Sequence, residues 1–289
     1  MTAAPLIPAA DISSVETPSG KDAAYENFPV GSWLLPARLR PHVATFYAFA
    51  RTIDDIADNP GLSAEDKVAR LDVFEDVVLG QAADIPGYEK AAHMRDSLLQ
   101  TGVEARHCID LLAAFKLDAV KSRYRDWADL MGYCELSAAP VGRYLLDLHG
   151  GSRDGYGPSD ALCMGLQVIN HVQDCQDDYR QLNRVYLPQD WMDEAGVRVE
   201  DLDDPQTSPG MRRVLDRCLE ATEVLLADAE PLPGGLRSRR LAMESAVILG
   251  LAKRLVFLLR RHDPLASRVE LSRADFIRCG IRGVLAGLF

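Results

Sequence analysis

An all-α fold is the architecture that the 289-residue sequence predicts, and two observations support it. Apolar residues recur at helical spacing along most of the chain after residue 22, and short polar or Gly/Pro joints separate the periodic segments. Strand signals are almost absent, because the sequence has no Asn-Gly hairpin turn and no sustained alternation of apolar and polar residues. A chain of this length buries most of its potential surface, so it has room for a sizeable internal cavity.

The expected helices follow one another along the whole chain. The first begins near Pro36 and ends at Asp58, because Asn59-Pro60 stops it. Ser63 then caps a second helix, with Asp66 at the spacing of a capping box. The expected helical segments are 36–58, 63–79, 87–101, 103–121, 126–149, 158–182, 208–231, 236–262 and 271–288.

The N-terminal segment differs in composition from the rest of the chain. Residues 1–22 are rich in Ala, Pro, Ser and Thr and are expected to form a disordered tail, followed by one helical domain over residues 23–289. The start of the chain has no signal-peptide pattern, and there is no apolar run of about 18 residues that would span a membrane. The six cysteines form no C-x-x-C pair, which favours a reduced, cytoplasmic protein.

The charge balance limits the partners of this protein. Its formal net charge is −11, which argues against nucleic acid, because phosphate binding needs a basic face. The C-terminal stretch 276–289 is apolar, with Arg278 and Arg282 interspersed, so a transient contact with the inner face of a membrane is one interpretation. Core packing of a last helix is the other, and the sequence favours it.

The end of the first expected helix carries a polar stripe. Asp54 and Asp58 are four residues apart and therefore project from one helix face, and Tyr47 and Arg51 lie on earlier turns of the same face. Asp55 is adjacent. The residues around this stripe are apolar, so it belongs either to a polar interior site or to a solvated face.

The helix expected at 158–182 carries a matching stripe. Asp174 and Asp178 are again four residues apart, Gln167 and Asn170 lie upstream on the same face, and Asp177 lies between the two aspartates. His171, within this stripe, is interpreted as a packed or hydrogen-bonded residue rather than a base.

Two such stripes favour a metal–diphosphate site. Carboxylates at this spacing repel one another unless a cation neutralises them, and Mg²⁺ is typically bound by one or two carboxylates together with substrate phosphates. A single stripe of this kind is usually a solvated face. A metal-binding bundle without organic substrate is less favoured, because Glu-x-x-His ligands are missing from both stripes. The candidate magnesium ligands are Asp54, Asp55, Asp58, Asn170, Asp174, Asp177 and Asp178.

Three sequence blocks together resemble the squalene and phytoene synthase family of isoprenoid enzymes. The first block is Tyr47 to Asp58, the second is Gln167 to Asp178 followed by Arg184-Val-Tyr-Leu-Pro, and the third is Tyr133 to Gly142. The resemblance covers most of residues 25–285 and implies an all-α isoprenoid-synthase bundle around a deep apolar cavity. It also implies Mg²⁺ as cofactor and a prenyl diphosphate as substrate.

The resemblance also implies roles for individual residues. Asp54, Asp58, Asp174 and Asp178 would act in catalysis through the magnesium ions, with Asn170 beside them. The implied substrate-binding residues are, for the diphosphate, Arg51, Gln167, Arg184, Tyr186 and Arg268 and, for the hydrocarbon, Phe28, Tyr47, Tyr133, Leu136, Ala138 and Gly142. Plain core or surface roles remain open for Phe28, Tyr186, Gly142 and Arg184.

One position departs from the family pattern. Condensing members read Asn-x-x-Arg-Asp in the second block, whereas this sequence has Gln173 before Asp174. This feature, with the entrance segment 26–36, resembles the branch that converts presqualene diphosphate and water to hydroxysqualene and diphosphate in hopanoid biosynthesis. Gln173 is therefore a candidate catalytic residue, and no NADPH is expected, because no dinucleotide-binding glycine motif is present.

Two alternatives to this reaction remain. The chain could be a condensing synthase of the same family, making presqualene diphosphate, dehydrosqualene or phytoene from prenyl diphosphates, or a non-catalytic helical partner of pathway enzymes. The four motif aspartates argue against the non-catalytic alternative, and Gln173 argues against the condensing one.

Overall fold

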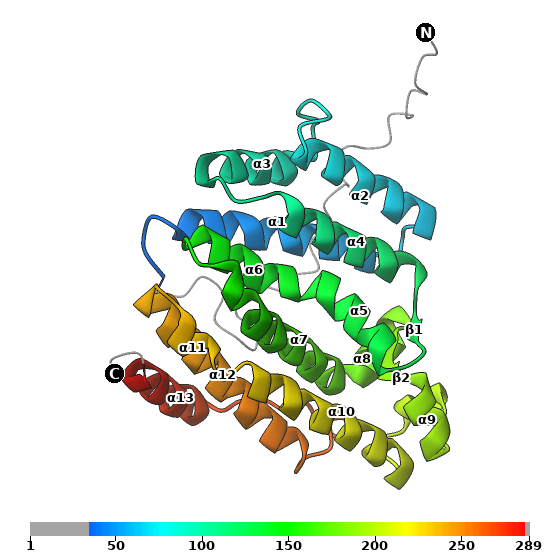
Figure 1. Ribbon diagram of the computed structural model, residues 1–289. Helices are drawn as coiled ribbons and strands as arrows, with labels where there is room; N and C mark the ends of the chain where they lie inside the picture. Colours follow the sequence, from blue (N-terminus) through cyan, green and yellow to red (C-terminus); the bar gives the residue numbers. More distant parts are fainter. Residues whose placement is uncertain (1–34, 287–289) are drawn as a thin grey trace.

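The computed structural model describes residues 35–286, with side chains as far as Gly283, and it confirms the predicted all-α fold (Figure 1). Two short parallel strands, β1 (Arg123–Tyr124) and β2 (Val185–Pro188), pair with each other between helices. The helices are α1 (Arg40–Asp58), α2 (Ala64–Val78), α3 (Glu89–Thr101), α4 (Arg106–Val120), α5 (Trp127–Ser137), α6 (Ala139–Leu148), α7 (Tyr156–Gln173), α8 (Cys175–Leu182), α9 (Gln189–Ala195), α10 (Pro209–Asp228), α11 (Leu232–Gly235), α12 (Arg239–Leu259) and α13 (Arg273–Ala286).

Local signals in the sequence place several helix ends correctly. The Ser63 side chain accepts a hydrogen bond from the backbone N–H of Asp66, so Ser63 caps α2 as predicted. α1 ends at Asp58, before Asn59-Pro60, as expected. Pro209 lies in the first turn of α10, where its missing N–H costs nothing, and Ser208 caps that helix.

Two expected helices are broken, and these predictions were wrong. The segment 126–149 divides at Ala138 into α5 and α6, with Pro140 in the first turn of α6. A proline inside a continuous helix would lack the N–H for a backbone hydrogen bond, and its ring would clash with the preceding turn. The segment 158–182 divides at Asp174, whose backbone dihedrals (φ −103°, ψ 10°) leave the helical range, so α8 begins at Cys175. The sequence at this second break contains no proline or glycine.

The helices surround two apolar clusters that stack along the molecule. α1, α2, α3, α4 and α6 enclose one cluster, and α5, α7, α9, α10 and α12 enclose the other. Figure 1 shows α5, α6 and α7 where the two groups meet, between α1 and α4 on one side and α10 and α12 on the other. Phe46 of α1 and Tyr144 of α6 stack with ring centroids 3.9 Å apart, which joins the first group to the middle of the bundle.

Within the described residues, no helix is both long and apolar enough to cross a membrane. The expected tail over residues 1–22, and Phe28, lie outside the described part of the chain.

Candidate active site

A polar pocket of about 280 Å³ lies where α1, α4, α5, α7, α8 and β2 meet, and both pairs of aspartates line it. The two acidic stripes, more than a hundred residues apart in sequence, are therefore brought to one site. The lining residues are Tyr47, Ala50, Arg51, Asp54, Asp58, Phe115, Asp118, Tyr133, Ser137, Gln167, Asn170, His171, Asp174, Asp178, Leu182, Arg184 and Tyr186.

On the α1 side, one arginine holds two carboxylates. Arg51 Nη1 lies 3.0 Å from Asp54 Oδ2, and Arg51 Nη2 lies 2.7 Å from Asp55 Oδ1. Burial raises the pKa of Asp54 well above its usual range, and the charge of Asp58 raises it further, although Arg51 opposes the shift. This face of α1 therefore holds more negative charge than its arginine balances.

On the α7–α8 side, Asp174 and Asp178 keep the spacing of one helical turn across the helix break. The backbone N–H of Asp178 donates to the Asp174 carbonyl oxygen at 2.8 Å, so the chain resumes a helical turn at once. Arg268, from the segment between α12 and α13, places Nη1 3.2 Å from Asp174 Oδ1. The predicted connection of Arg268 with this site is consistent with that contact.

Asp118, at the end of α4, is a buried carboxylate that the sequence analysis missed. Tyr133 Oη donates to Asp118 Oδ2 at 2.6 Å, and Tyr186 Oη donates to Asp118 Oδ1 at 2.9 Å. Burial raises the pKa of Asp118, although Arg184 and the two tyrosines lower it. Asp118 carries no motif in the sequence, because its partners come from α5 and β2, and only the fold brings them together.

Arg184 joins three elements beneath the pocket. Its side chain is 7% exposed, Nη1 lies 2.5 Å from Asp58 Oδ1, Nη2 donates to the Ala57 carbonyl oxygen at 3.0 Å, and Nε donates to the Asp118 carbonyl oxygen at 3.2 Å. The nearby carboxylates raise the pKa of this guanidinium, although its burial opposes the shift. Arg184 thus neutralises part of the acidic charge of the pocket, and its predicted hold on a diphosphate stays a prediction.

His171 lines the pocket as well as packing in the core. Its ring stacks on Tyr186 with centroids 3.6 Å apart, and its Nε2 lies 3.2 Å from Gln167 Nε2. The expectation of a packed histidine is confirmed, but the sequence did not indicate that the ring would also border the site.

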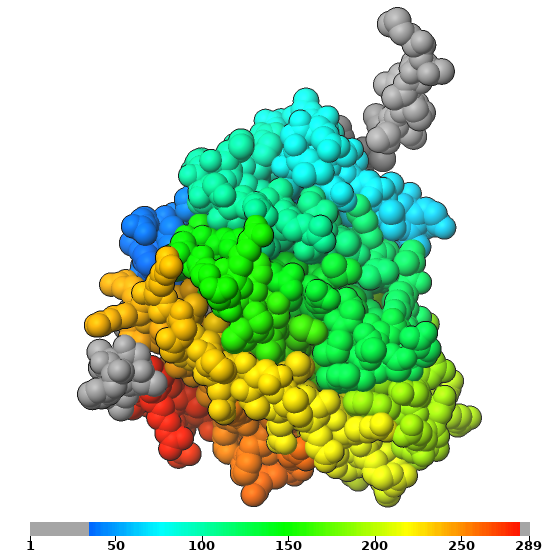
Figure 2. Space-filling view, viewed as in Figure 1, coloured from blue at the N-terminus to red at the C-terminus, as the bar shows by residue number. Residues whose placement is uncertain are grey.

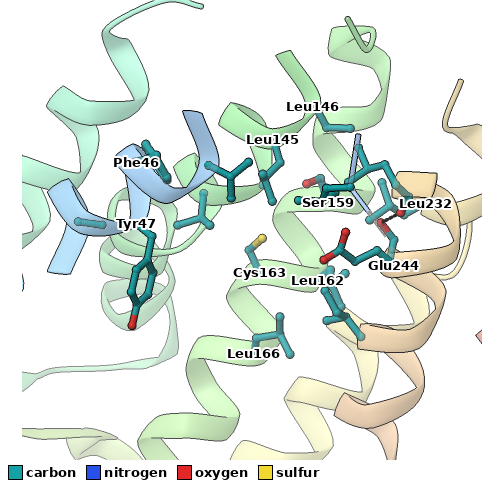
Figure 3. A pocket seen from close by; sticks show the side chains of 18 residues that line it. Phe46, Tyr47, Leu145, Leu146, Ser159, Leu162, Cys163, Leu166, Leu232 and Glu244 are labelled. Carbon is teal, nitrogen blue, oxygen red and sulfur yellow. Dashed lines mark hydrogen bonds between the residues drawn. The ribbon is translucent and has the colours of Figure 1, made fainter. Parts of the chain in front are cut away.

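An apolar cavity of about 330 Å³ adjoins the polar pocket, and Tyr47 and Ala50 of α1 line both. Its walls come from α1, α6, α7, α11 and α12 (Figure 3). Most of the side chains that line this cavity are aliphatic or aromatic, and Glu244 and Ser159 are among the few polar ones. A chain with a charged head and a hydrocarbon tail would fit across the two spaces.

Gly142 is required where α6 passes α7. A Cβ at this position would lie 2.3 Å from Ser159 Oγ and 2.8 Å from Cys163 Sγ, so a side chain here would force the helices apart. Gly142 lines the apolar cavity, as predicted. Gly142 therefore combines close helix packing with a place on the cavity wall, and its predicted contact with the hydrocarbon stays a prediction.

Other predicted residues lie outside both spaces. Asp55 turns toward Arg51, and Asp177 is exposed, since neither shares the inward face of its neighbours. Leu136 and Ala138 pack in or against the core on either side of Ser137, which does line the pocket. The structure therefore does not place these four residues, which were predicted to contact metal or substrate, in the lining of either space.

Gln173 is the most consequential correction. It is buried at the end of α7, and its Nε2 donates to the Val269 carbonyl oxygen at 2.5 Å instead of lining the pocket. Helix geometry explains this, because Gln173 is one residue before Asp174 and therefore projects about 100° around the helix axis from it.

Residues 22–275 match the sequence profile described as Squalene/phytoene synthase. The chain belongs to this family. Within it, the hydroxysqualene synthase of Rhodopseudomonas palustris is 45% identical over 265 residues, which are 92% of this chain and 90% of that protein. The hydroxysqualene synthase of Sinorhizobium fredii is 40% identical and covers 89% of this chain and 87% of its own length.

Solved structures of the squalene/phytoene synthase family share the fold. A crystal structure of squalene synthase HpnC from Alicyclobacillus acidocaldarius superposes with a TM-score of 0.71 at 29% identity, covering 82% of this chain and 89% of that one. The resemblance inferred from the three motif blocks is therefore confirmed at the level of family and fold.

Proposed function

We propose that this family member converts presqualene diphosphate and water to hydroxysqualene and diphosphate. The observation that supports this proposal best is an acidic pocket that adjoins an apolar cavity along α1. The acidic pocket suits a metal-bound diphosphate, and the apolar cavity suits the hydrocarbon. The choice of reaction within the family rests on the similarity to proteins named hydroxysqualene synthase and on glutamine at position 173.

The donors of the pocket fit magnesium. Asp54, Asp58, Asp174, Asp178 and Asn170 offer oxygen atoms, which Mg²⁺ prefers. Burial raises the pKa of Asp54 first and the charge of Asp58 raises it further, and a divalent cation would stabilise both carboxylates in their charged form. In the described residues, no three His, Cys, Asp or Glu side chains are close enough to hold a metal by themselves. That arrangement suits a cation that completes its coordination with substrate phosphates and water. When bound, magnesium would supply the electrophilic pull on the departing diphosphate.

The arginines at the pocket complement this arrangement. Arg51 and Arg268 now contact Asp54 and Asp174, at 3.0 and 3.2 Å. If Asp54 and Asp174 bound a cation, Arg51 would keep its pairing with Asp55 and Arg268 its pairing with Glu270. Each guanidinium would then have N–H groups left for the diphosphate oxygens, which arginine binds well. Arg184 is held by Asp58 and by two backbone carbonyls, so it would act as a fixed positive charge.

The reaction breaks the C–O bond to the diphosphate, rearranges the C–C bonds of the cyclopropane ring and forms a C–O bond to water. The C–O bond to the diphosphate breaks and the diphosphate leaves with the electron pair. The cyclopropylcarbinyl cation then rearranges, and the oxygen of a water molecule adds to it and loses a proton. The apolar walls exclude other water, and the ring of Tyr47, which lines both spaces, would offer its negative π face to the cation. The departing diphosphate would accept the proton that the added water loses.

Gln173 enters this proposal as a positioning residue. Its amide holds the carbonyl of Val269, next to Arg268, which contacts Asp174. An arginine at position 173 would bring a buried charge to this junction and alter the placement of Arg268. If Gln173→Arg gave the same product at the same rate, the hypothesis of a role for Gln173 would be wrong.

A product assay tests the proposal. Purified protein with Mg²⁺ would receive presqualene diphosphate in one sample and farnesyl diphosphate in another, and extracted lipids would be separated by gas chromatography with mass detection. The expected result is hydroxysqualene from the first sample and no product from the second. A C30 product from farnesyl diphosphate would instead assign the chain to the condensing branch of the family.

A further inference from the structure

The outer face of α13 differs from the rest of the protein surface. α13 lies at the edge of the molecule against α12, in red at the lower left of Figure 1 and Figure 2. Its inward side is fixed by Asp275, whose Oδ1 accepts a hydrogen bond from Arg254 Nε at 2.7 Å. Only this side of α13 packs against the rest of the protein. The predicted core packing therefore holds for the inward side of the helix and not for its outward side.

The outward side of α13 is apolar along its middle. Ile277 is 64% exposed, Ile281 is 59% exposed and Phe276 is 40% exposed. Ile277 and Ile281 are four residues apart and lie one above the other on the helix. Large apolar side chains gathered on one exposed helix face mark an interaction surface.

Arginines flank this apolar face. Arg273, Arg278 and Arg282 are exposed, and none of them forms an ion pair with a carboxylate among the described residues. The whole chain carries a net charge of −11, so a face with three uncompensated arginines departs from its average. A helix with an apolar centre and basic flanks has the chemistry that binds an anionic lipid surface.

A groove between α12 and α13 adds a place for a phosphate group. Its volume is about 500 Å³, and its lining includes four basic side chains, Lys253, Arg254, Arg278 and Arg282, and one carboxylate, Asp275, which pairs with Arg254. Lys253 and Arg254 are already paired with carboxylates, whereas Arg278 and Arg282 are the cations that an incoming phosphate would meet first.

α12 connects this face with the apolar cavity. Its residues Leu241, Glu244, Ser245 and Ile248 line the cavity, and other side chains of the same helix line the groove toward α13. A single helix, about 10 Å in diameter, therefore separates the space for hydrocarbon from the α13 face. A lipid surface at α13 would lie close to the cavity that takes an apolar chain.

We propose that the outer face of α13 and its groove with α12 dock the protein on a bilayer containing anionic phospholipids. The apolar side chains would enter the headgroup region while Arg278 and Arg282 bind lipid phosphates. A second copy of this chain is a less suitable occupant, because a symmetric contact would place the arginines of one copy against those of the other. Only the purpose of docking, which is access to an apolar substrate, rests on the proposed function.

Vesicle sedimentation with the full-length chain tests the docking. We expect the protein to sediment with vesicles of phosphatidylcholine and phosphatidylglycerol, less with phosphatidylcholine alone, and less as salt is added. The double variant Arg278→Gln/Arg282→Gln should bind about 30-fold more weakly, at roughly fivefold for each arginine near the surface. Ile277→Ser/Ile281→Ser should also lose binding.

Matched controls separate the face from general charge and hydrophobicity. Arg125→Gln/Arg153→Gln removes two exposed arginines elsewhere, and Leu99→Ser removes an apolar side chain that is 77% exposed on α3. Both should bind vesicles like the unaltered chain, and all variants should melt at similar temperatures. Equal binding by the α13 variants and the controls would overturn the proposal. The proposal would also be overturned if the unaltered chain did not sediment with vesicles and instead formed, in analytical ultracentrifugation, a dimer that Ile277→Ser/Ile281→Ser dissociates.

A second readout distinguishes this proposal from the proposed function. With presqualene diphosphate dispersed in detergent, the α13 variants should turn over substrate at the unaltered rate, whereas substrate presented in anionic vesicles should be converted more slowly. Failure of the unaltered chain to convert substrate in detergent would contradict the proposed function and leave the vesicle binding as a separate result. Equal rates of the variants on both forms of substrate would contradict the purpose assigned to docking.

Discussion

Two carboxylates of the polar pocket are stabilised in different ways. Asp118 accepts hydrogen bonds from Tyr133 and Tyr186, so most of its hydrogen-bonding capacity is used within the protein. Asp54 has one arginine partner and a carboxylate neighbour, Asp58, which raises its pKa. The first arrangement is typical of a structural anchor, and the second of a carboxylate that awaits a cation.

Removing the charge of Asp54 should therefore abolish most of the activity. In Asp54→Asn we expect kcat to fall by about 10²- to 10³-fold, because a ligand that stabilises the leaving diphosphate is lost. Asp177→Asn is the matched control, since Asp177 is exposed and lies outside the pocket lining. It should change kcat by no more than roughly twofold. Comparable losses in both variants, measured by product formation against Mg²⁺ concentration, would show that the ligand set is different.

Asp54→Asn should lower kcat but raise the stability of the protein. A carboxyl whose pKa is raised on folding binds more protons in the native state between its unfolded and folded pKa values, so the free energy of unfolding falls as pH rises through that interval. In the presence of EDTA, Asp54→Asn should thus raise Tm at neutral pH. The gain should shrink as the pH approaches the unfolded pKa of aspartate. A Tm difference that stays constant from neutral to acidic pH would contradict this explanation.

At the scale of secondary structure, the site depends on where helices break and how closely they pass. Asp174 and Asp178 keep the spacing of one helical turn across the break and line the pocket with the α1 aspartates, while Gln173 points to the segment after α12. The crossing of α6 over α7 at Gly142 sets one wall of the apolar cavity. Neither feature is a property of a single helix.

Substituting Gly142 tests the close crossing. Gly142→Ala should lower the free energy of unfolding by about 1–3 kcal/mol, because the new Cβ would overlap Ser159 Oγ and Cys163 Sγ. Gly132→Ala on α5 is the control, since no atom lies within 4 Å of a Cβ there. The control should gain up to about 1 kcal/mol from better helix propensity.

Urea unfolding measures both effects, and a double variant checks the cause. Ser159→Ala removes one of the two overlapping atoms, so it should restore part of the stability that Gly142→Ala loses. Equal stabilities of Gly142→Ala and Gly132→Ala would mean that α6 and α7 adjust without cost.

At the scale of the whole molecule, the bundle encloses an apolar space beside a charged one. The acidic pocket receives side chains from both groups of helices, and the apolar cavity lies behind it between α1, α6, α7 and α12. This separation gathers the candidate metal ligands at one end and leaves the hydrocarbon space with few polar side chains, among them Glu244 and Ser159.

Filling the cavity should affect catalysis without unfolding the protein. Ile248→Phe adds volume toward a cavity of about 330 Å³, so we expect kcat/KM for presqualene diphosphate to fall roughly tenfold or more. The added ring occupies existing space, so the stability should change by less than about 1.5 kcal/mol. Val224→Phe, at a position that is 62% exposed on α10, is the control and should leave kcat/KM unchanged. An unaltered kcat/KM in Ile248→Phe would show that the substrate lies elsewhere.

The sequence alone determined the helical fold, the two aspartate stripes and the family, because these depend on periodicity and on residues close together in the chain. Tertiary structure alone decided which aspartates share a pocket and which do not, since Asp177 and Asp55 differ from their neighbours only in direction. It also supplied Asp118, whose partners come from α5 and β2, and it placed the Gln173 amide on the Val269 carbonyl instead of in the pocket lining. Such features depend on long-range packing, which overrides local helix propensity, and single-chain patterns do not encode them.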